Sequence, residues 1–348
     1  MIVDQHVELY RSSAPARLKR NVEACLGRWS IDRPEFEGLI NRLSQDAGPI
    51  FYVSTVSRGQ AGTTSDLDVI VVGDSGRPAV ALSNMLFHRG RRVGAKVIDE
   101  TRIATAIAQL NSVSRSGDDP LGCPAPPLAV KLADLERLVN GFSFEAGTPY
   151  LHALPALCRW TYERSLSDYV LQRACCALAD AAGAQRAAQV HLTDVLVAAM
   201  DVVMAAHGRV QSNTKWTMVR WEEFRREETG VDAEVVGVID RTRDRLRAGV
   251  DLASSLLDAL NASFTQFVGP ALPDELGLQL ASDVKIGRYL TGAVYLTRPG
   301  RTAILAAENE QELADLLACA PGLPPDRAGT ALTLLQQGFA AYRPGGVS

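Results

Sequence analysis

The feature that most constrains the fold is a pair of apolar runs joined by a polar segment, IFYVSTVSRGQAGTTSDLDVIVV, at residues 50–72. The runs cover residues 50–53 and 69–72 and are rich in β-branched side chains. Short runs of this kind, bounded by turn residues, are typical of buried strands. Between them lie Gly59 and Gly62, which can adopt backbone angles that other residues avoid. The stretch therefore predicts two buried strands connected by a polar, glycine-containing loop.

Two aspartates, Asp66 and Asp68, open the second predicted strand. Because side chains alternate across a strand, both carboxylates project from one face while Leu67 turns to the core. Two like charges this close are unfavourable unless a cation lies between them. Aspartate oxygens at this spacing suit Mg²⁺, which proteins commonly hold with one or two carboxylates plus substrate phosphates. The pattern therefore indicates a magnesium-binding pair.

This stretch resembles the signature of the nucleotidyltransferase superfamily that includes DNA polymerase β and the aminoglycoside nucleotidyltransferases. That signature is a Gly-Ser pair, a loop with Arg-Gly, and then Asp-hydrophobic-Asp. The sequence matches it with Arg58-Gly59 and with Ser65-Asp66-Leu67-Asp68-Val69, while Ser54-Thr55 stands at the Gly-Ser pair. Ser54 thus replaces a glycine that, in the superfamily, lets backbone amides approach the triphosphate. The matching motifs lie within residues 50–72, and the resemblance extends toward residue 100.

The resemblance implies a metal-dependent enzyme that transfers a nucleoside monophosphate from a nucleoside triphosphate (NTP), such as ATP, to a hydroxyl group of an acceptor. The acceptor that we expect is a small molecule, and the expected cofactor is Mg²⁺ or Mn²⁺. Asp66 and Asp68 would be metal ligands and catalytic residues. A third carboxylate on the next strand usually completes such a site; Asp99 is the first choice for that role and Glu100 the second. The alternative for Asp99 is a cap at the end of the strand, or a surface acid.

The same resemblance implies a set of nucleotide-binding residues in the loop between the two strands: Ser54, Thr55, Arg58, Gly59 and Ser65. Lys215, in the segment at residues 208–224, joins them because a lysine from a helical domain commonly reaches the triphosphate in relatives of this fold. Trp216 and Arg220 of this segment are four residues apart and would share a helix face. The alternative is that Trp216 and Trp221 belong to the core and Lys215 to the surface.

Helical periodicity surrounds the predicted strands. Residues 1–49 predict two amphipathic helices that precede the first strand. After the second strand we expect a helix over residues 78–89 that packs Val80, Met85 and Phe87 inward. A third strand is predicted over residues 95–100. Residues 112–127 are rich in Ser, Gly and Pro and predict a linker that ends the first domain.

The predicted fold class is α+β in three parts. A nucleotidyltransferase core with a small mixed sheet occupies residues 1–111. Residues 128–283 have apolar residues at helical spacing and predict an α-helical bundle, including one long helix over residues 234–260 whose alternating arginines we expect to face solvent. Residues 284–348 predict two β-rich runs around Arg298-Pro299-Gly300, two helices and a short strand. That order loosely resembles a small winged-helix domain.

Composition limits the partners. The net charge of −4 and a second tail helix with few basic residues make a nucleic-acid substrate less favoured than a small molecule, so the tail is expected to serve packing or a protein partner. The six cysteines show no metal-binding spacing, and no signal peptide is recognised, which favours reduced thiols and a cytoplasmic protein. The best apolar run, Leu192–Ala206, is broken by Asp194 and Asp201, so we expect no membrane span.

Two other functions remain open from the sequence. The chain could be a catalytically silent member of the fold that binds a nucleotide or a partner; Ser54 in the glycine position favours this, and the intact Asp66-Leu67-Asp68 opposes it. It could also be a nucleotidyltransferase that modifies tRNA or a protein. The negative net charge weakens the tRNA case, because phosphate contacts need cations.

Overall fold

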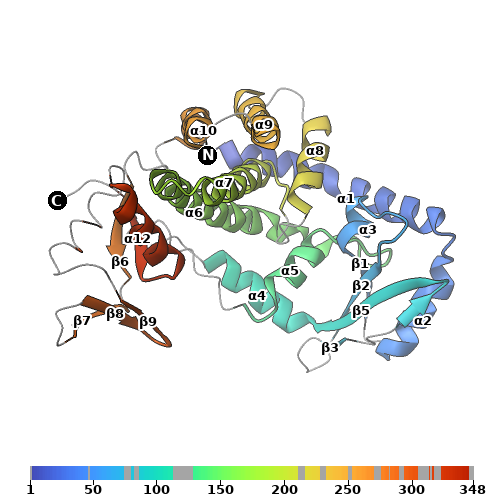
Figure 1. The fold of residues 1–348 in the computed structure, drawn as a ribbon. Helices are drawn as coiled ribbons and strands as arrows, with labels where there is room; N and C mark the ends of the chain where they lie inside the picture. The colour runs from blue at the N-terminus through green and yellow to red at the C-terminus, as the bar shows by residue number, and fades with distance from the viewer. Residues whose placement is uncertain are drawn as a thin grey trace. The chain divides into compact units, whose positions relative to one another are not determined.

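The protein is an α+β chain, mostly helical with small sheets (Figure 1). The computed structural model describes residues 2–45, 48–73, 80–81, 86–112, 128–210, 216–227, 233–249, 253–269, 276–281, 283–289, 294–304, 313, 316 and 323–344. The chain separates into two compact units. The first contains Met1–Ser114, Pro124–Tyr162 and Val203–Lys215, and the second contains Arg115–Cys123, Glu163–Val202 and Trp216–Ser348. The three-part division expected from the sequence stays a prediction.

The first unit is built on one mixed sheet. Its strands are β1 (Ile50–Tyr52), β2 (Leu67–Gly73), β3 (Val80–Ala81), β4 (Leu86–His88) and β5 (Arg91–Asp99). The order is β1-β2-β5-β3, and β4 also pairs with β5. β1 runs antiparallel to β2, and β2 runs parallel to β5. The predicted first and second strands and the small mixed sheet are therefore present.

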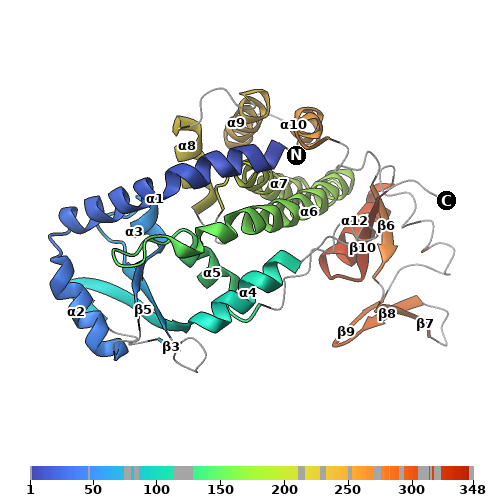
Figure 2. The same cartoon turned by 180° about the vertical axis from the view of Figure 1, so that it is seen from behind.

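Helices lie on both sides of this sheet (Figure 2). α1 (Ile2–Arg28) and α2 (Arg33–Ser44), which are the two helices predicted over residues 1–49, lie on one side. α4 (Glu100–Ser112) and α5 (Leu132–Val139) lie on the other, and the 3₁₀ helix η1 (Pro149–Ala153) follows α5. Because helices flank the sheet, β2 is buried almost throughout, with Leu67, Ile70 and Val71 fully inaccessible.

The helix predicted over residues 78–89 is wrong. The described residues there form β3 and β4, and Phe87 is 55% exposed instead of packed inward. β4 and β5 form a hairpin closed by Arg89 and Gly90, both with positive φ (48° and 77°). Two successive left-handed residues form the turn that matches the natural twist of paired strands. Val80 is in β3, whereas Met85 lies outside the described residues.

The second unit contains most of a helical bundle. It includes the larger parts of α6 (Leu154–Ala181) and α7 (Gln185–Ala206), together with α8 (Thr217–Glu227), α9 (Ala233–Ala248) and α10 (Ala253–Val268). Tyr169 of α6 stacks on Phe264 of α10 with ring centroids 4.1 Å apart, and its hydroxyl donates to Asn261. The α-helical character predicted for this region is confirmed for the described residues of α6, α7, α8, α9 and α10.

The long helix predicted over residues 234–260 is two helices. α9 ends at Ala248, Gly249 adopts a left-handed conformation (φ 65°), and α10 begins at Ala253. A left-handed glycine ends a helix without the steric cost that other residues meet. Of the four arginines expected to face solvent, Arg243 is 7% exposed and pairs with Glu222 (2.7 Å), so that expectation holds only for the other three.

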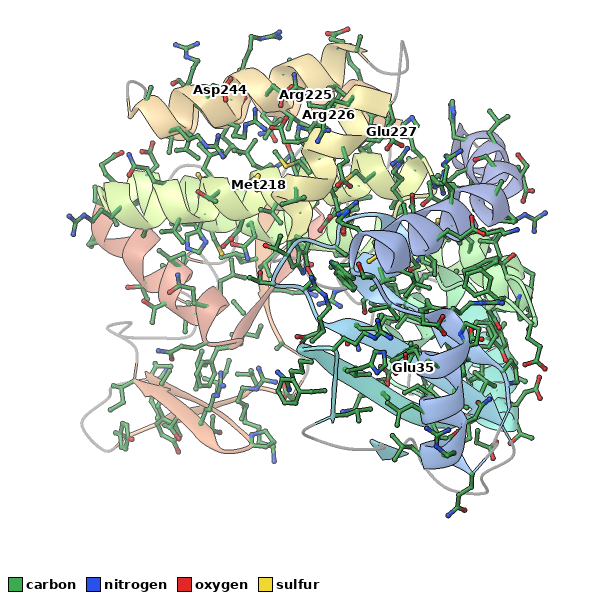
Figure 3. The ribbon with its side chains drawn as sticks, turned by 90° about the vertical axis from the view of Figure 1, so that its right-hand side faces the viewer. Glu35, Met218, Arg225, Arg226, Glu227 and Asp244 are labelled. Carbon is green, nitrogen blue, oxygen red and sulfur yellow. The ribbon has the colours of Figure 1, made fainter. Side chains whose placement is uncertain are left out.

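α8 joins this bundle through buried polar contacts. Trp221 is fully buried and its indole N–H donates to Asp240 of α9 (2.9 Å), while Arg220 pairs with Asp201 of α7 (3.3 Å). Arg225, labelled in Figure 3, also reaches Asp240 (2.6 Å). Trp221 is therefore a core residue, as the alternative interpretation expected, whereas Trp216 is only half-buried and Lys215 lies outside the described residues.

The end of the chain is partly as predicted. β8 (Val294–Arg298) and β9 (Arg301–Ile304) form the hairpin expected around residues 298–300, and β7 (Lys285–Arg288) extends it to three strands. α12 (Pro325–Gln336) and β10 (Ala340–Pro344) follow, and β10 pairs antiparallel with β6 (Leu276–Leu280), a strand that the sequence did not predict. Of the other predicted helix only Leu313 and Leu316 are described. The winged-helix resemblance stays a prediction.

Among the described residues, α7 is the one helix long and apolar enough to cross a membrane by length and composition. It has 22 residues, and 61% of its apolar window is buried inside the protein, as in the core helix of a bundle. Cys25, Cys158, Cys175 and Cys176 are buried and free, and Cys123 and Cys319 lie outside the described residues.

Candidate functional site

The site begins where β1 turns into the short helix α3 (Ser54–Arg58). The loop predicted here contains this single helical turn. Val53 donates its backbone N–H to the carbonyl of Asp68 (3.1 Å), which ties the turn to the neighbouring strand. Ser54 then adopts φ 60°, a left-handed angle that serine rarely takes. The structure thus shows why glycine suits this position, at which Ser54 departs from the superfamily signature.

Asp66 and Asp68 lie on one face of the sheet, as predicted. Leu67 between them is fully buried, whereas the side chain of Asp66 is 45% exposed. Asp68 is paired in register with Gly94 of β5. A Cβ atom added to Gly94 would lie 2.3 Å from Oδ1 of Asp68. The carboxylate of Asp68 therefore lies directly against the backbone of β5, in space that only glycine leaves open.

The environment of Asp68 disfavours the ionised form of its carboxyl group. Burial raises the pKa of Asp68 above its ordinary value, and the nearby Asp66 carboxylate adds to that rise. Ser54, Arg137 and Lys96 act in the opposite direction and lower this pKa. The Ser54 hydroxyl is buried beside Asp68, and it has no hydrogen-bond partner of ordinary geometry in the described part of the chain.

A cavity of about 630 Å³ opens beside the two aspartates. Its walls come mainly from β2, from β5, from α5 and from the segment that leads into α5. Its charged lining residues are three carboxylates and five cations: Asp66, Asp68, Asp134, Arg92, Lys96, Arg102, Lys131 and Arg137. A pocket of this volume accommodates a small organic ligand, and the excess of cations favours an anionic one.

Asp134 is a site residue that the sequence analysis missed. It lies on α5, is 4% exposed, and pairs with Lys96 of β5 and with Arg137 (3.8 Å). Lys131, Asp134 and Arg137 recur every third residue, which is also the usual pattern of a solvated helix face. The spacing alone therefore gave no signal, because only the packing of α5 beside β5 brings Asp134 to the cavity.

Asp99 has a different place from the one expected. It ends β5 and accepts hydrogen bonds from the backbone N–H groups of Thr101 (2.9 Å) and Arg102 (3.3 Å) at the start of α4. This is the helix-capping role that the sequence left open as the alternative. Asp99 is opposite Gly73 in the β2–β5 register, and it is not among the described residues that line the cavity. Glu100 is exposed on the first turn of α4 and does not line the cavity either.

Three of the other predicted nucleotide ligands, Arg58, Gly59 and Ser65, support the turn and are not among the described residues that line the cavity. Arg58 pairs with the buried Glu136 and donates to the carbonyl of Val210 (3.1 Å). Gly59 caps α3 with φ 77°, and the Ser65 hydroxyl accepts the N–H of Gly62 (2.9 Å). Thr55 lies in the first turn of α3, and Lys215 falls outside the described residues.

The donor set fits a divalent cation only in part. Within the described residues, no group of three or more His, Cys, Asp or Glu side chains is arranged to hold a metal ion. Asp66 and Asp68 alone fit Mg²⁺ shared with substrate phosphates, which is the common arrangement for this ion. A metal held tightly by protein ligands alone does not fit the described residues.

The fold and the site define an α+β protein with a carboxylate pair in a cation-rich cavity, and the comparisons with known proteins add the family. The chain belongs to DUF6001, described as a family of unknown function, which matches residues 11–337. No curated protein matches the chain. A solved structure of a nucleotidyltransferase-like protein from Exiguobacterium sibiricum 255-15 is similar at 13% identity, covering 88% of this chain and 99% of that one, with a TM-score of 0.32. A TM-score this low establishes neither a shared fold nor a shared activity.

Proposed function

We propose that this protein is a metal-dependent nucleotidyltransferase that moves a nucleoside monophosphate from an NTP to a hydroxyl group of a small-molecule acceptor. The observation that carries the proposal is the position of Asp66 and Asp68, side by side in a cavity whose other charged groups are mostly cationic. Carboxylates for a divalent cation and cations for phosphates are the two electrostatic needs of phosphoryl transfer. The resemblance of residues 50–72 to the superfamily signature supports the same assignment.

The chemistry assigned to the site is a displacement at the α-phosphorus. The acceptor oxygen forms a bond to this phosphorus while the bond to the bridging oxygen breaks, and pyrophosphate leaves with the electron pair. Asp66, the exposed member of the pair, takes the hydroxyl proton and passes it to water. Bound Mg²⁺ would neutralise phosphate charge and lower the pKa of the acceptor hydroxyl. Arg92, Lys131 and Arg137 are the lining cations that would hold the phosphate oxygens.

A transfer assay tests this proposal. Each of the four labelled NTPs is incubated with Mg²⁺ and pools of hydroxyl compounds, with tRNA and proteins as further pools, and both the product and pyrophosphate are measured. We expect Asp66→Asn and Asp68→Asn to reduce transfer about a thousandfold or more, since such groups contribute several kcal/mol at phosphoryl-transfer sites. Turnover near that of the wild type in either variant would contradict the assignment.

The matched control is Asp32→Asn. Asp32 caps α2 by accepting the N–H of Glu35 (2.9 Å), and asparagine caps equally well, so this variant loses the same charge outside the cavity. Thermal unfolding of all three variants completes the design. Because burial raises the pKa of Asp68, its ionised form is unfavourable in the folded state, and Asp68→Asn should be at least as stable as the wild type at neutral pH.

A catalytically silent nucleotide-binding protein is the second candidate. It is favoured by the cations beside the carboxylates and by the capping role of Asp99, which leaves only two carboxylates on the described sheet strands facing the cavity. The transfer assay, combined with a calorimetric titration of the NTP, separates the two candidates. A silent member binds an NTP in a calorimetric titration but releases no pyrophosphate with any acceptor pool.

A further inference from the structure

Each carboxylate of the cavity lies near a cation of the protein itself. Arg92 is the residue of β5 beside Asp66, because Leu67 pairs in register with Val93, and its guanidinium lies 3.9 Å from the Asp66 carboxylate. Asp134 pairs with Lys96 and Arg137. The same two cations lower the pKa of Asp68. Positive charge of the protein therefore already stabilises the carboxylates to which a divalent cation would bind.

The two sets of ion pairs differ in strength. Lys96 and Asp134 are largely buried, with side chains 26% and 6% exposed, so this pair is fixed in the cavity wall. Arg92 and Asp66 are 62% and 45% exposed. An exposed pair of this kind contributes little to stability and exchanges its partners readily. Arg92 has no other ion-pair partner in the part of the chain that the structure describes.

Arg92 is suited to exchange carboxylate for phosphate. A guanidinium binds phosphate through two parallel hydrogen bonds, and a phosphate chain carries more charge than one carboxylate. Arg92 and Lys96 lie on the same face of β5 on either side of Gly94, against which the Asp68 carboxylate lies. A phosphate chain in the cavity, alongside the Asp66–Asp68 pair, would thus meet one of these cations at each end.

We propose that Arg92 competes with the divalent cation for Asp66 in the ligand-free protein, and that nucleotide binding removes this competition by drawing Arg92 to the phosphates. The metal site is then completed by the nucleotide in two ways, through its oxygens and through the release of Asp66. This inference rests on the proposed function only in that the cavity binds a nucleoside triphosphate. It makes metal and nucleotide binding mutually reinforcing through a residue of this chain.

The test is Arg92→Gln, measured in two separate binding experiments without turnover. In the first, Mn²⁺ alone is titrated into the protein and free Mn²⁺ is followed by its electron paramagnetic resonance signal. We expect the variant to bind Mn²⁺ roughly two- to fivefold more tightly than the wild type, the worth of an exposed ion pair. In the second, ATP, GTP, CTP and UTP are titrated separately by calorimetry in the presence of EDTA. There the variant should bind the preferred nucleotide at least fivefold more weakly.

The matched control is Arg89→Gln. Arg89 is on the same hairpin, is similarly exposed and pairs with Glu35 (2.5 Å) on α2, but it is not among the described residues that line the cavity (Figure 3 labels Glu35). We expect it to leave both affinities unchanged. A general loss of structure in Arg92→Gln would weaken the binding of both Mn²⁺ and nucleotide. Tighter Mn²⁺ binding together with weaker nucleotide binding is therefore the result that identifies competition.

The outcomes separate the inference from the proposed function. If Mn²⁺ binding is unchanged or weaker in Arg92→Gln while the wild type binds both ligands, the competition is refuted and the proposed function stands. If the wild type binds both a nucleotide and Mn²⁺, and Arg92→Gln changes the two affinities in opposite directions, the inference stands. If the transfer assay then yields no product, the protein is the catalytically silent nucleotide-binding protein. If the wild type binds no nucleotide either in EDTA or together with Mn²⁺, both are refuted.

Discussion

Ser54 occupies the position that the superfamily signature gives to glycine, yet its backbone has the left-handed angle that favours glycine. Its buried hydroxyl lies near Asp68 but has no hydrogen-bond partner of ordinary geometry among the described residues. A strained residue beside a candidate site is kept in place by its surroundings, here by the bond of Val53 to β2.

We expect Ser54→Gly to stabilise the protein by about 0.5–1 kcal/mol, because glycine removes a left-handed strain of roughly 1–2 kcal/mol and costs part of it in unfolded-state entropy. Nucleotide binding should be kept or improved. Ser57→Gly on the same helix is the control: its φ is not positive and its hydroxyl donates to Ser54, so it should lower stability. Thermal or urea unfolding measures both. Destabilisation by Ser54→Gly would show that the Ser54 hydroxyl has a role of its own.

Gly94→Ala is a sharper test of the carboxylate site. The new Cβ would lie 2.3 Å from Oδ1 of Asp68, so the carboxylate must move away from the strand. We expect nucleotide-dependent Mn²⁺ binding to weaken at least tenfold while the unfolding temperature changes little, since Asp68 is not part of the apolar core. Gly27→Ala is the control, because a Cβ there has nothing within 4 Å. Retained Mn²⁺ binding in Gly94→Ala would mean that Asp68 is not a ligand in this geometry.

For single residues, the sequence predicted the features that the alternation of side chains along a strand determines. Asp66, Leu67 and Asp68 project as expected, because strand geometry alone sets their faces. Asp134 could not be predicted, because its place in the cavity depends on α5 packing beside β5, and so does the buried Arg58–Glu136 pair. The sequence also had no means of choosing between ligand and cap for Asp99.

The elements show a similar division. β1 and β2 were predictable because their apolar runs are continuous and bounded by turn residues. The helix expected over residues 78–89 failed because short strands at a sheet edge are stabilised by pairing with β5, here Leu86 opposite Val93, and carry little periodicity of their own. The single helix expected over residues 234–260 failed because the left-handed Gly249 outweighs the apolar pattern.

Asp99 gives a prediction for α4. We expect Asp99→Ala to destabilise the protein by about 0.5–2 kcal/mol, because the N–H groups of Thr101 and Arg102 lose their acceptor, whereas Asp99→Asn retains the cap and most of the stability. Urea unfolding measures the difference. The transfer assay on Asp99→Asn then separates the two roles. Normal transfer supports a purely capping residue, and lost transfer at unchanged stability would restore Asp99 as a catalytic carboxylate.

At the scale of the whole molecule, the cavity belongs to one unit. Every described residue that lines it falls within the first unit, and the tail over residues 284–348 falls within the second. The tail is also tied to its own unit, since β10 pairs with β6 and Gln336 of α12 contacts His191 of α7 (3.1 Å). Nucleotide binding and the integrity of the tail should therefore be separable.

We expect deletion of residues 284–348 to leave nucleotide affinity within about threefold of the wild type while lowering the stability of the second unit, because β6 loses its partner strand and its edge becomes exposed. Calorimetric titration of the preferred NTP and a thermal scan read the two effects. Deletion of β10 alone, residues 340–344, is the milder control. If the truncated protein remains folded but binds no nucleotide, the tail contributes to the site and the division into units has no functional meaning.

The first unit is discontinuous, because the chain leaves it after Tyr162 and returns at Val203. The returning segment completes the packing of the first unit. Gly208 lies against Tyr10 of α1, and the His207 and His6 rings pack with their centroids 4.8 Å apart. The carbonyl of Val210 accepts a hydrogen bond from Arg58. On the ribosome, α1 and the sheet are therefore made long before the residues that finish packing them. We therefore expect the unit that carries the cavity to finish packing only after residues 163–202 of the second unit have been synthesised. Its folding is then coupled to the order of synthesis.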